Sequence, residues 1–144
     1  MEILKDVDNI DELEQVSENA TWQEFERLVS EIFEEHGYFI QVNKVHTKKT
    51  DGILKRAQYD IIARNGNKVI AADCKHWNRK RNKVSALKKA VDGHIKRCTF
   101  LCEKINIEVQ PVIISLFQED IKFHKEVPII PVTSLNDFLL NYSN

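Results

Sequence analysis

The stretch YDIIARNGNKVIAADCKHW, residues 59–77, contains two short apolar runs joined by Asn65-Gly66-Asn67. An Asn-Gly pair between apolar runs predicts a β-hairpin. The first run carries Asp60 and the second carries Asp73 with Lys75. Carboxylates and ammonium groups are seldom buried without a partner. We therefore interpret these three charged residues as a functional site within the hairpin.

The positions of the three residues can be compared with hairpin geometry. Directly opposed residues of an antiparallel pair have a constant index sum and share one face of the sheet. A turn at Gly66-Asn67 places Asp60 opposite Asp73, and a turn one residue earlier places them diagonally. Both registers put Asp60, Asp73 and Lys75 on one face. A loop one residue longer or shorter would reverse the parity of one strand and separate them.

Two adjacent carboxylates require a nearby cation, because at about 4 Å they repel each other by about 4 kcal/mol at the effective dielectric of a partly buried site. A structural ion pair with Lys75 is the simplest interpretation. Mg²⁺ suits the two acids better, since it prefers oxygen ligands and keeps water molecules that can be activated as nucleophiles. Lys75, about 7 Å along its strand, is then placed to steady a hydroxide or a phosphate.

A third acidic residue lies on a predicted helix that precedes the hairpin. Residues 21–24 fit a capping box, and apolar residues then recur at helical spacing until Gly37. At about 100° per residue, Glu26 falls beside Val29 and Phe33, which predicts that it faces the core side. On the helix alone, a boundary glutamate paired with a lysine is the favoured alternative.

The remaining elements follow from periodicity and turn signals. The 144 residues predict one compact domain, with an acidic extension over 1–20, a core over 21–117 and a C-terminal strand and helix over 118–144. The fold class is a mixed α/β layer without internal repeats. We predict helices over 9–19, 22–36, 83–97 and 135–142, strands over 38–46, 59–64, 68–75, 109–117 and 129–132, and a polar loop over 47–58.

Composition excludes several classes of protein. Hydrophobic residues make up 42% of the chain and charged residues 30%, and no apolar run approaches the roughly 20 residues of a membrane span. The acidic N-terminus lacks an apolar signal core, so we expect an intracellular, cytoplasmic protein. Three cysteines without a CxxC spacing argue against disulfides and against a four-thiolate metal site.

Charge is strongly segregated along the chain. Residues 1–35 hold 2 basic and 12 acidic side chains, whereas residues 44–97 hold 16 basic and 4 acidic ones. A basic middle in a nearly neutral protein indicates a surface that faces a polyanion, and we expect DNA. The residues expected to contact its phosphates are Lys48, Lys49, Lys55, Arg56, His76, Arg79, Lys80, Arg81, Lys83, Lys88 and Lys89.

The helix WQEFERLVSEIFEEHGY, residues 22–38, followed by Asp60 and then by Asp73-Cys74-Lys75, resembles the PD-(D/E)xK nuclease superfamily. Its Mrr-like restriction endonucleases and archaeal Holliday junction resolvases are the most similar groups. The resemblance covers about residues 21–117. It implies a restriction endonuclease-like αβββαβ core that hydrolyses DNA phosphodiester bonds with Mg²⁺, or with Mn²⁺ as a substitute.

The resemblance also implies roles for individual residues. Asp60 and Asp73 would be metal ligands, with the backbone carbonyl of Cys74 as a further ligand. Lys75 would orient or help to deprotonate the attacking water. Glu26 would match the acidic residue of the family's helix and is a candidate metal ligand. Tyr59 departs from the pattern, because it stands where the motif has proline, and the glutamine motif of RecB-like exonucleases is not visible.

Three functions remain open at this point. The first choice is an Mrr-like, metal-dependent DNA endonuclease. A Holliday junction resolvase of the same fold would act as a homodimer, and Leu135, Phe138 and Leu139 of the last helix could supply the pairing surface. A DNA-binding module that does not cut is the third function. All four acid and lysine positions, 26, 60, 73 and 75, are filled, which argues against it, since such a module needs no carboxylates facing a polyanion.

Overall fold

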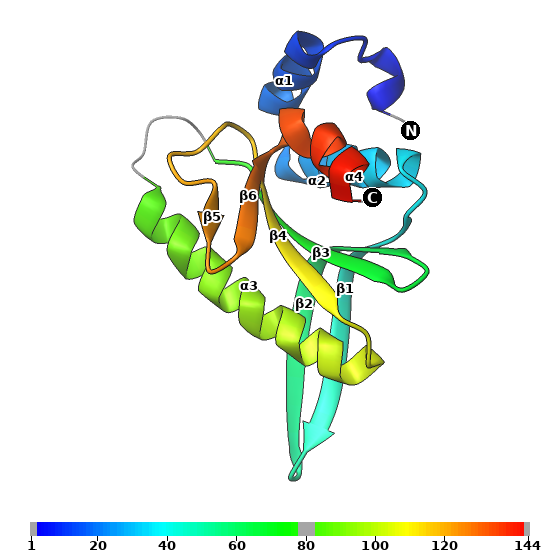
Figure 1. Cartoon of the computed structure of the whole chain (residues 1–144), viewed down its shortest axis with the longest axis vertical. Helices are drawn as coiled ribbons and strands as arrows, with labels where there is room; N and C mark the ends of the chain where they lie inside the picture. Colours follow the sequence, from blue (N-terminus) through cyan, green and yellow to red (C-terminus); the bar gives the residue numbers. More distant parts are fainter. Residues whose placement is uncertain (1–2, 78–82, 143–144) are drawn as a thin grey trace.

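The chain forms a six-stranded mixed sheet with helices on both faces (Figure 1). The computed structural model describes residues 3–77 and 83–142. The strands lie in the order β1-β2-β3-β4-β6-β5 and pair both antiparallel and parallel, which confirms the predicted mixed α/β fold. The elements are η1 (Leu4–Asp6), α1 (Ile10–Asn19), α2 (Trp22–Glu35), β1 (Phe39–Thr50), β2 (Ile53–Asn65), β3 (Lys68–Lys75), α3 (Val84–Ile105), β4 (Val109–Ser115), β5 (Phe123–His124), β6 (Val127–Pro131), η2 (Val132–Ser134) and α4 (Leu135–Tyr142).

The β2–β3 hairpin adopts one of the two predicted registers. Its pairing runs from Asn65↔Lys68 to Ile61↔Ala72. Gly66 begins the turn with a φ of 61°, a conformation that favours glycine. The next position in this register places Asp60 opposite Asp73, as a turn at Gly66-Asn67 predicts. The parity that brings these two acids together is therefore present in the fold.

Strand β3 is buried on both faces because helices cover the sheet from both sides. Ile70 and Ala72 pack into the core beneath α2 and α4. Val69 and Ala71 point to the opposite face, where they pack against the C-terminal half of α3. Helix α3 is the crossover between β3 and β4, which pair in parallel. This arrangement fixes the end of β3, where Asp73 and Lys75 lie, between two packed layers.

The predicted loop over residues 47–58 is wrong. Both strands continue through it as a regular antiparallel ribbon, with pairing that extends to Thr50↔Ile53 around a turn at Asp51-Gly52. The ribbon projects beyond the body of the protein (Figure 1). Because its distal residues are exposed on both faces, they lack the apolar alternation by which a half-buried strand is recognised. Nothing in the local sequence therefore distinguished the ribbon from a polar loop.

Helix α3 is longer than predicted, since it continues past residue 97 to Ile105 with Cys98 and Leu101 buried. The two-residue strand β5 at the sheet edge was not predicted. The three cysteines are free thiols. None of the helices in the described ranges, 3–77 and 83–142, is long and apolar enough to cross a membrane.

Helix α4 does not provide the pairing surface suggested for a dimer. Leu135 and Leu139 are both 0% exposed and belong to the core cluster beneath α2. Phe138 is partly buried against the same cluster and stacks on Tyr142 at a ring-centroid distance of 5.5 Å. The apolar residues of this helix therefore pack within the core of the chain itself.

This burial predicts unequal effects for two adjacent leucines. Leu139→Ala should lower the free energy of unfolding by about 2–5 kcal/mol, because it leaves a cavity in the core. Leu140→Ala is the matched control, since Leu140 is 54% exposed, and it should change stability by about 0.5 kcal/mol or less. Urea denaturation of both variants measures the difference. Equal effects, or a loss of dimers in Leu139→Ala, would contradict the burial of α4.

Candidate active site

Four of the residues singled out in the sequence come together at one end of the β2–β3 hairpin. Glu26 reaches this place from the second turn of α2, whose N-terminus is fixed by the predicted capping box between Thr21 and Glu24. Glu26 is 4% exposed and Asp73 is 6% exposed. We call the carboxyl groups of Glu26, Asp60 and Asp73 the carboxylate cluster. Lys75 adjoins it on β3.

Asp60 lies where the regular strand pairing is interrupted on both sides. The β1–β2 ladder is paired at Val42↔Ile61 and again at Lys44↔Tyr59, but not between Asn43 and Asp60. Asn43 has a φ of 52°, a left-handed conformation that asparagine tolerates better than most residues. Toward β3, the N–H of Cys74 donates a hydrogen bond to Asp60 Oδ2 over 2.9 Å. The aspartate side chain thus takes a position where the ladder has opened.

Asp73 is held between two cations. Lys75 Nζ lies 3.1 Å from Asp73 Oδ2, and Arg97 Nη2 lies 3.6 Å from the same oxygen. This buried oxygen has no hydrogen-bond partner among the described residues, so both contacts are charge interactions without hydrogen-bond geometry. Lys75 Nζ also lies 5.6 Å from the ring centroid of Trp77, which packs against the core. The ammonium is therefore directed toward the cluster.

The three carboxyl groups differ in proton affinity. Burial and then the negative charge of Asp60 raise the pKa of Glu26 to about 7. Burial and a hydrogen bond to Asp73 raise the pKa of Asp60 to about 6. Burial would also raise the pKa of Asp73, but the Lys75 ammonium and the hydrogen bond from Asp60 lower it below its ordinary value. At about pH 5, below both raised pKa values, Glu26 and Asp60 are therefore mostly protonated, while Asp73 is ionised.

Two residues that support the cluster were missed in the sequence. The side chain of Asn43 forms a hydrogen bond with Glu26, which favours the ionised form of that acid. Arg97 contacts Asp73 from α3, one turn beyond His94. Its own position is fixed by the Tyr59 hydroxyl, which donates a hydrogen bond to the Arg97 carbonyl over 2.5 Å. The sequence treats Arg97 as one of several basic residues on α3, and only docking of the helix distinguishes it.

His94 connects Arg97 to the sheet. Burial lowers the pKa of His94, which favours the neutral ring. Its Nε2 lies 2.8 Å from the carbonyl oxygen of Ala71, so Nε2 carries the proton and donates it. Arg97 Nη2 then donates to Nδ1 over 3.2 Å. These contacts hold the Arg97 guanidinium beside Asp73, on the side of the sheet that α3 covers.

The donor set fits a hard divalent cation. It consists of carboxylate oxygens, one of which is buried without a hydrogen-bond partner, and it includes two carboxyl groups whose pKa values are raised to about 7 and about 6. Oxygen ligands of this kind suit Mg²⁺ or Mn²⁺. Burial raises the pKa of the Cys74 thiol well above its ordinary value, which leaves the backbone carbonyl as the donor at that position. Within the described parts of the chain, no three His, Cys, Asp or Glu side chains are already arranged as a ligand set.

The predicted phosphate-binding residues other than Lys83 divide into three groups. Lys48, Lys49, Lys55 and Arg56 are exposed on the projecting ribbon, and Lys88 and Lys89 are exposed on α3. His76 is half-buried, where its Nε2–H donates to the Ser17 carbonyl over 2.7 Å and its ring packs on Phe25. Arg79, Lys80 and Arg81 lie outside the described residues.

The prediction for Lys83 is wrong. This side chain is 6% exposed, and its Nζ lies 3.2 Å from Glu119 Oε2 in a buried ion pair. Removing a lysine from such a pair would leave an uncompensated buried charge, so Lys83 is not free to contact a phosphate. Because its partner is distant in sequence, nothing in the basic run around position 80 distinguished Lys83 from its neighbours.

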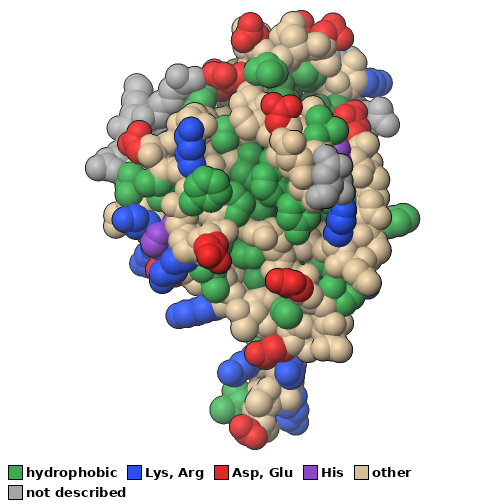
Figure 2. Space-filling model, in the orientation of Figure 1, with side chains coloured by type: hydrophobic (Ala, Val, Ile, Leu, Met, Phe, Trp, Pro, Cys, Tyr) green, Lys and Arg blue, Asp and Glu red, His purple; other side chains and the backbone are tan. Residues whose placement is uncertain are grey.

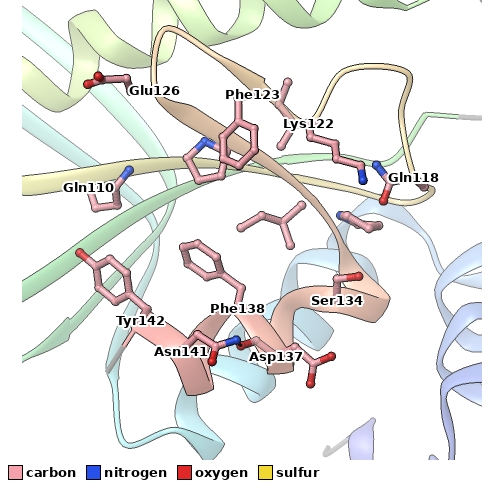
Figure 3. Close-up of a pocket in the computed structure, with 14 residues that line it drawn as sticks. Gln110, Gln118, Lys122, Phe123, Glu126, Ser134, Asp137, Phe138, Asn141 and Tyr142 are labelled. Carbon is pink, nitrogen blue, oxygen red and sulfur yellow. Dashed lines mark hydrogen bonds between the residues drawn. The ribbon is translucent and has the colours of Figure 1, made fainter. Parts of the chain in front are cut away.

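Two cavities bear differently on this site. One of about 530 Å³ lies between α2 and β1 and is lined by Glu26 and Asn43 among others, so it reaches the carboxylate cluster. Another of about 500 Å³ lies between β6 and α4, where Phe123, Phe138 and Tyr142 surround a mostly apolar hollow (Figure 3). No residue of the cluster lines the second cavity. The cavity between α2 and β1 is therefore the one that adjoins the carboxylate cluster.

Comparisons with known proteins agree with this fold. The chain is 32% identical over 120 residues to an uncharacterized protein of Archaeoglobus fulgidus, and the match covers 83% of this chain and 90% of that protein. It is similar in structure to the small subunit of the heterodimeric restriction endonuclease R.BspD6I, with a TM-score of 0.58 and 17% sequence identity. That match covers 92% of this chain and 76% of the subunit.

A family model provides the assignment. The model Mrr_cat, described as restriction endonuclease, matches residues 17–104, which is more than half of the chain. The matched range begins just before α2 and ends near the end of α3, so it contains Glu26, Asp60, Asp73 and Lys75. The chain belongs to this restriction endonuclease family.

Proposed function

We propose that this protein is a metal-dependent endonuclease that hydrolyses phosphodiester bonds in DNA, of the Mrr-like type. The family supports nuclease activity, and one observation of the site carries the rest. Three carboxyl groups meet beside an ammonium at the open end of a hairpin, where burial and mutual repulsion raise the pKa of two of them. A cluster of this kind is unfavourable for a module that only binds a polyanion, since ionised carboxylates repel phosphates.

Each residue of the site has a proposed task. Asp60 and Asp73 hold Mg²⁺, with the Cys74 carbonyl as a further donor, and Glu26 acts on the site through Asp60. When bound, the metal ion polarises the phosphate and lowers the pKa of a coordinated water. Lys75 orients the attacking water or stabilises the charge that develops on the phosphate. Arg97 keeps Asp73 ionised and in place from the α3 side.

The exposed basic residues are proposed to hold the DNA on either side of this site. Those of the ribbon lie farther out than Asp60 along β1 and β2, and Lys88 and Lys89 lie on the first turns of α3. Lys and Arg side chains gather where the ribbon projects from the molecule (Figure 2). A phosphate backbone that passes Asp60 and Asp73 can therefore be bound on both sides of the cut.

Cleavage by variants tests the proposed activity. Wild type should convert supercoiled plasmid to nicked and linear forms only with Mg²⁺ or Mn²⁺, as resolved on agarose gels. Asp60→Asn and Lys75→Met should each lose about 10²-fold or more in rate, because each removes charge that the reaction requires. Glu26→Gln tests the helix acid, and Glu35→Gln, exposed on the same helix, should leave the rate unchanged.

Linear duplex and a four-way junction are tested in parallel. Cutting of the junction alone would favour a resolvase over an endonuclease of restriction type. Binding of DNA without cutting of any substrate in either metal would overturn the enzyme and leave a DNA-binding module. Undiminished cutting by Asp60→Asn would show that the chemistry lies elsewhere in the chain.

The pH dependence of metal binding provides a second test that does not need activity. The pKa values of Glu26 and Asp60 are raised from ordinary values of 4.5 and 3.8 to about 7 and about 6, so folding favours their protonated forms. Without metal, the stability that they contribute is complete at low pH and is lost as pH rises through these folded values. The lowered pKa of Asp73 acts in the opposite direction, but only in more acidic solution.

A cation must displace those protons, so binding should strengthen as pH rises. We expect Mg²⁺ to raise the melting temperature more at pH 8 than at pH 5.5, as measured by thermal unfolding with and without EDTA. Asp60→Asn should remove most of the Mg²⁺ effect and make the metal-free protein less sensitive to pH between these values. An equal Mg²⁺ effect at both pH values would contradict a proton-retaining metal site.

A further inference from the structure

The ribbon formed by residues 44–59, which we call the arm, is a regular and well-defined element. Pairing is continuous from Lys44↔Tyr59 to Thr50↔Ile53. Asp51 and Gly52 close it with φ values of 52° and 77°, a turn with two positive φ values that matches the twist of paired strands. The arm extends well past the rest of the sheet (Figure 1). It therefore presents a narrow two-stranded surface to the surroundings.

The arm is attached to the body near its base. The rings of His46 and Tyr59 meet edge to face at 5.8 Å, and Lys104 Nζ donates to the Thr47 carbonyl over 2.8 Å. Beyond this base, the residues from Thr47 to Arg56 are all exposed. The arm is thus anchored to α3 at one end and open to a partner along its outer length.

The charges of the arm fit a polyanion. It carries five basic residues and one acidic residue, Asp51. Lys48 pairs directly with Lys55, and like charges in this position destabilise a sheet. Glu103 lies 4.0 Å from Lys48, an exposed contact that offsets little of this repulsion. Lys49 and Arg56 point from the other face, so both faces of the arm are basic.

The tip of the arm is apolar. Ile53 is 64% exposed and Leu54 is 66% exposed, although both lie in regular strand structure. Because they are consecutive, they point to opposite faces of the arm. The distal part of the molecule shows hydrophobic atoms among Lys and Arg side chains (Figure 2). A partner for this tip must offer apolar surface within a polyanion.

We propose that the arm enters the major groove of duplex DNA, where its basic residues contact the flanking phosphates and Ile53 and Leu54 contact thymine methyl groups. This inference rests on the proposed function, because it extends the DNA surface of the same site. The major groove, about 12 Å wide, admits a two-stranded ribbon, and the thymine methyl is an apolar group on its floor. The tip is seven residues from Asp60, or about 23 Å, which corresponds to about seven base pairs from the cut.

Shortening the arm tests whether it binds DNA. In the short-arm variant, Asn-Gly replaces residues 48–55, so that Thr47 and Arg56 remain paired across a two-residue turn. Binding to a 30-base-pair duplex is measured by fluorescence anisotropy in EDTA, where no cutting occurs. We expect affinity to fall about tenfold or more. The slope of log K against log salt should become shallower by about 2–3, because three lysines are removed.

The tip is tested by removing the methyl groups from the DNA. A duplex in which uracil replaces every thymine keeps base pairing and charge but lacks the methyl. Wild type should bind it about fourfold more weakly for each methyl group buried by the tip. A variant with both Ile53→Ser and Leu54→Ser should bind the two duplexes equally. Phe123→Ser changes a residue that is 67% exposed at the opposite edge of the sheet, and this variant should discriminate between the two duplexes as wild type does.

Several outcomes would overturn the inference. The first is unchanged affinity and salt slope in a folded short-arm variant. The second is equal binding of thymine and uracil duplexes by wild type. The third is a short-arm variant that loses binding to anionic phospholipid vesicles but still binds DNA as wild type does. The proposed function is judged separately by cleavage. If wild type cuts DNA and the short-arm variant binds DNA as wild type does, only the proposal for the arm is refuted. If binding depends on the arm but no DNA is cut, only the proposed enzyme activity is refuted.

Discussion

The apposition of Asp60 and Asp73, at the point where β2 parts from β3, is the constraint on which the rest of the site depends. The two acids occupy opposed positions of the hairpin register, immediately beyond the last paired residues, Ile61 and Ala72. Each neighbouring feature offsets part of the resulting repulsion. The Cys74 N–H binds one carboxyl group, Lys75 binds the other, and a shared hydrogen bond lowers the charge of the pair.

Helix α3 provides the rigid support behind this pair. Three contacts join it to the sheet close to Asp73, namely the Tyr59 hydroxyl on the Arg97 carbonyl, the His94 ring on the Ala71 carbonyl and the Arg97 guanidinium on Asp73 itself. The first two fix the backbone and the ring, and the third fixes the acid. The carboxyl group of Asp73 is therefore positioned by α3 as much as by its own strand.

The sequence predicted those parts of the fold in which apolar pattern records burial. The hairpin parity, the cap of α2 and the inward position of Glu26 all follow from local spacing. The arm escaped prediction because exposure on both faces removes the alternation of a strand. Lys83 was misassigned because Glu119, its buried partner, is 36 residues away. Arg97 could not be distinguished from other basic residues without knowing how α3 docks.

The order of these residues along the chain has a kinetic consequence. Asp60, Asp73 and Lys75 lie within one hairpin, and hairpins close in about 1–10 μs. The parallel pairing of β3 with β4 must wait until the whole α3 crossover has formed, and such non-local pairing is slower. These timescales predict that the hairpin brings its two aspartates together before Arg97 docks beside them. The surroundings of Asp73 are therefore complete only when α3 has docked against β3.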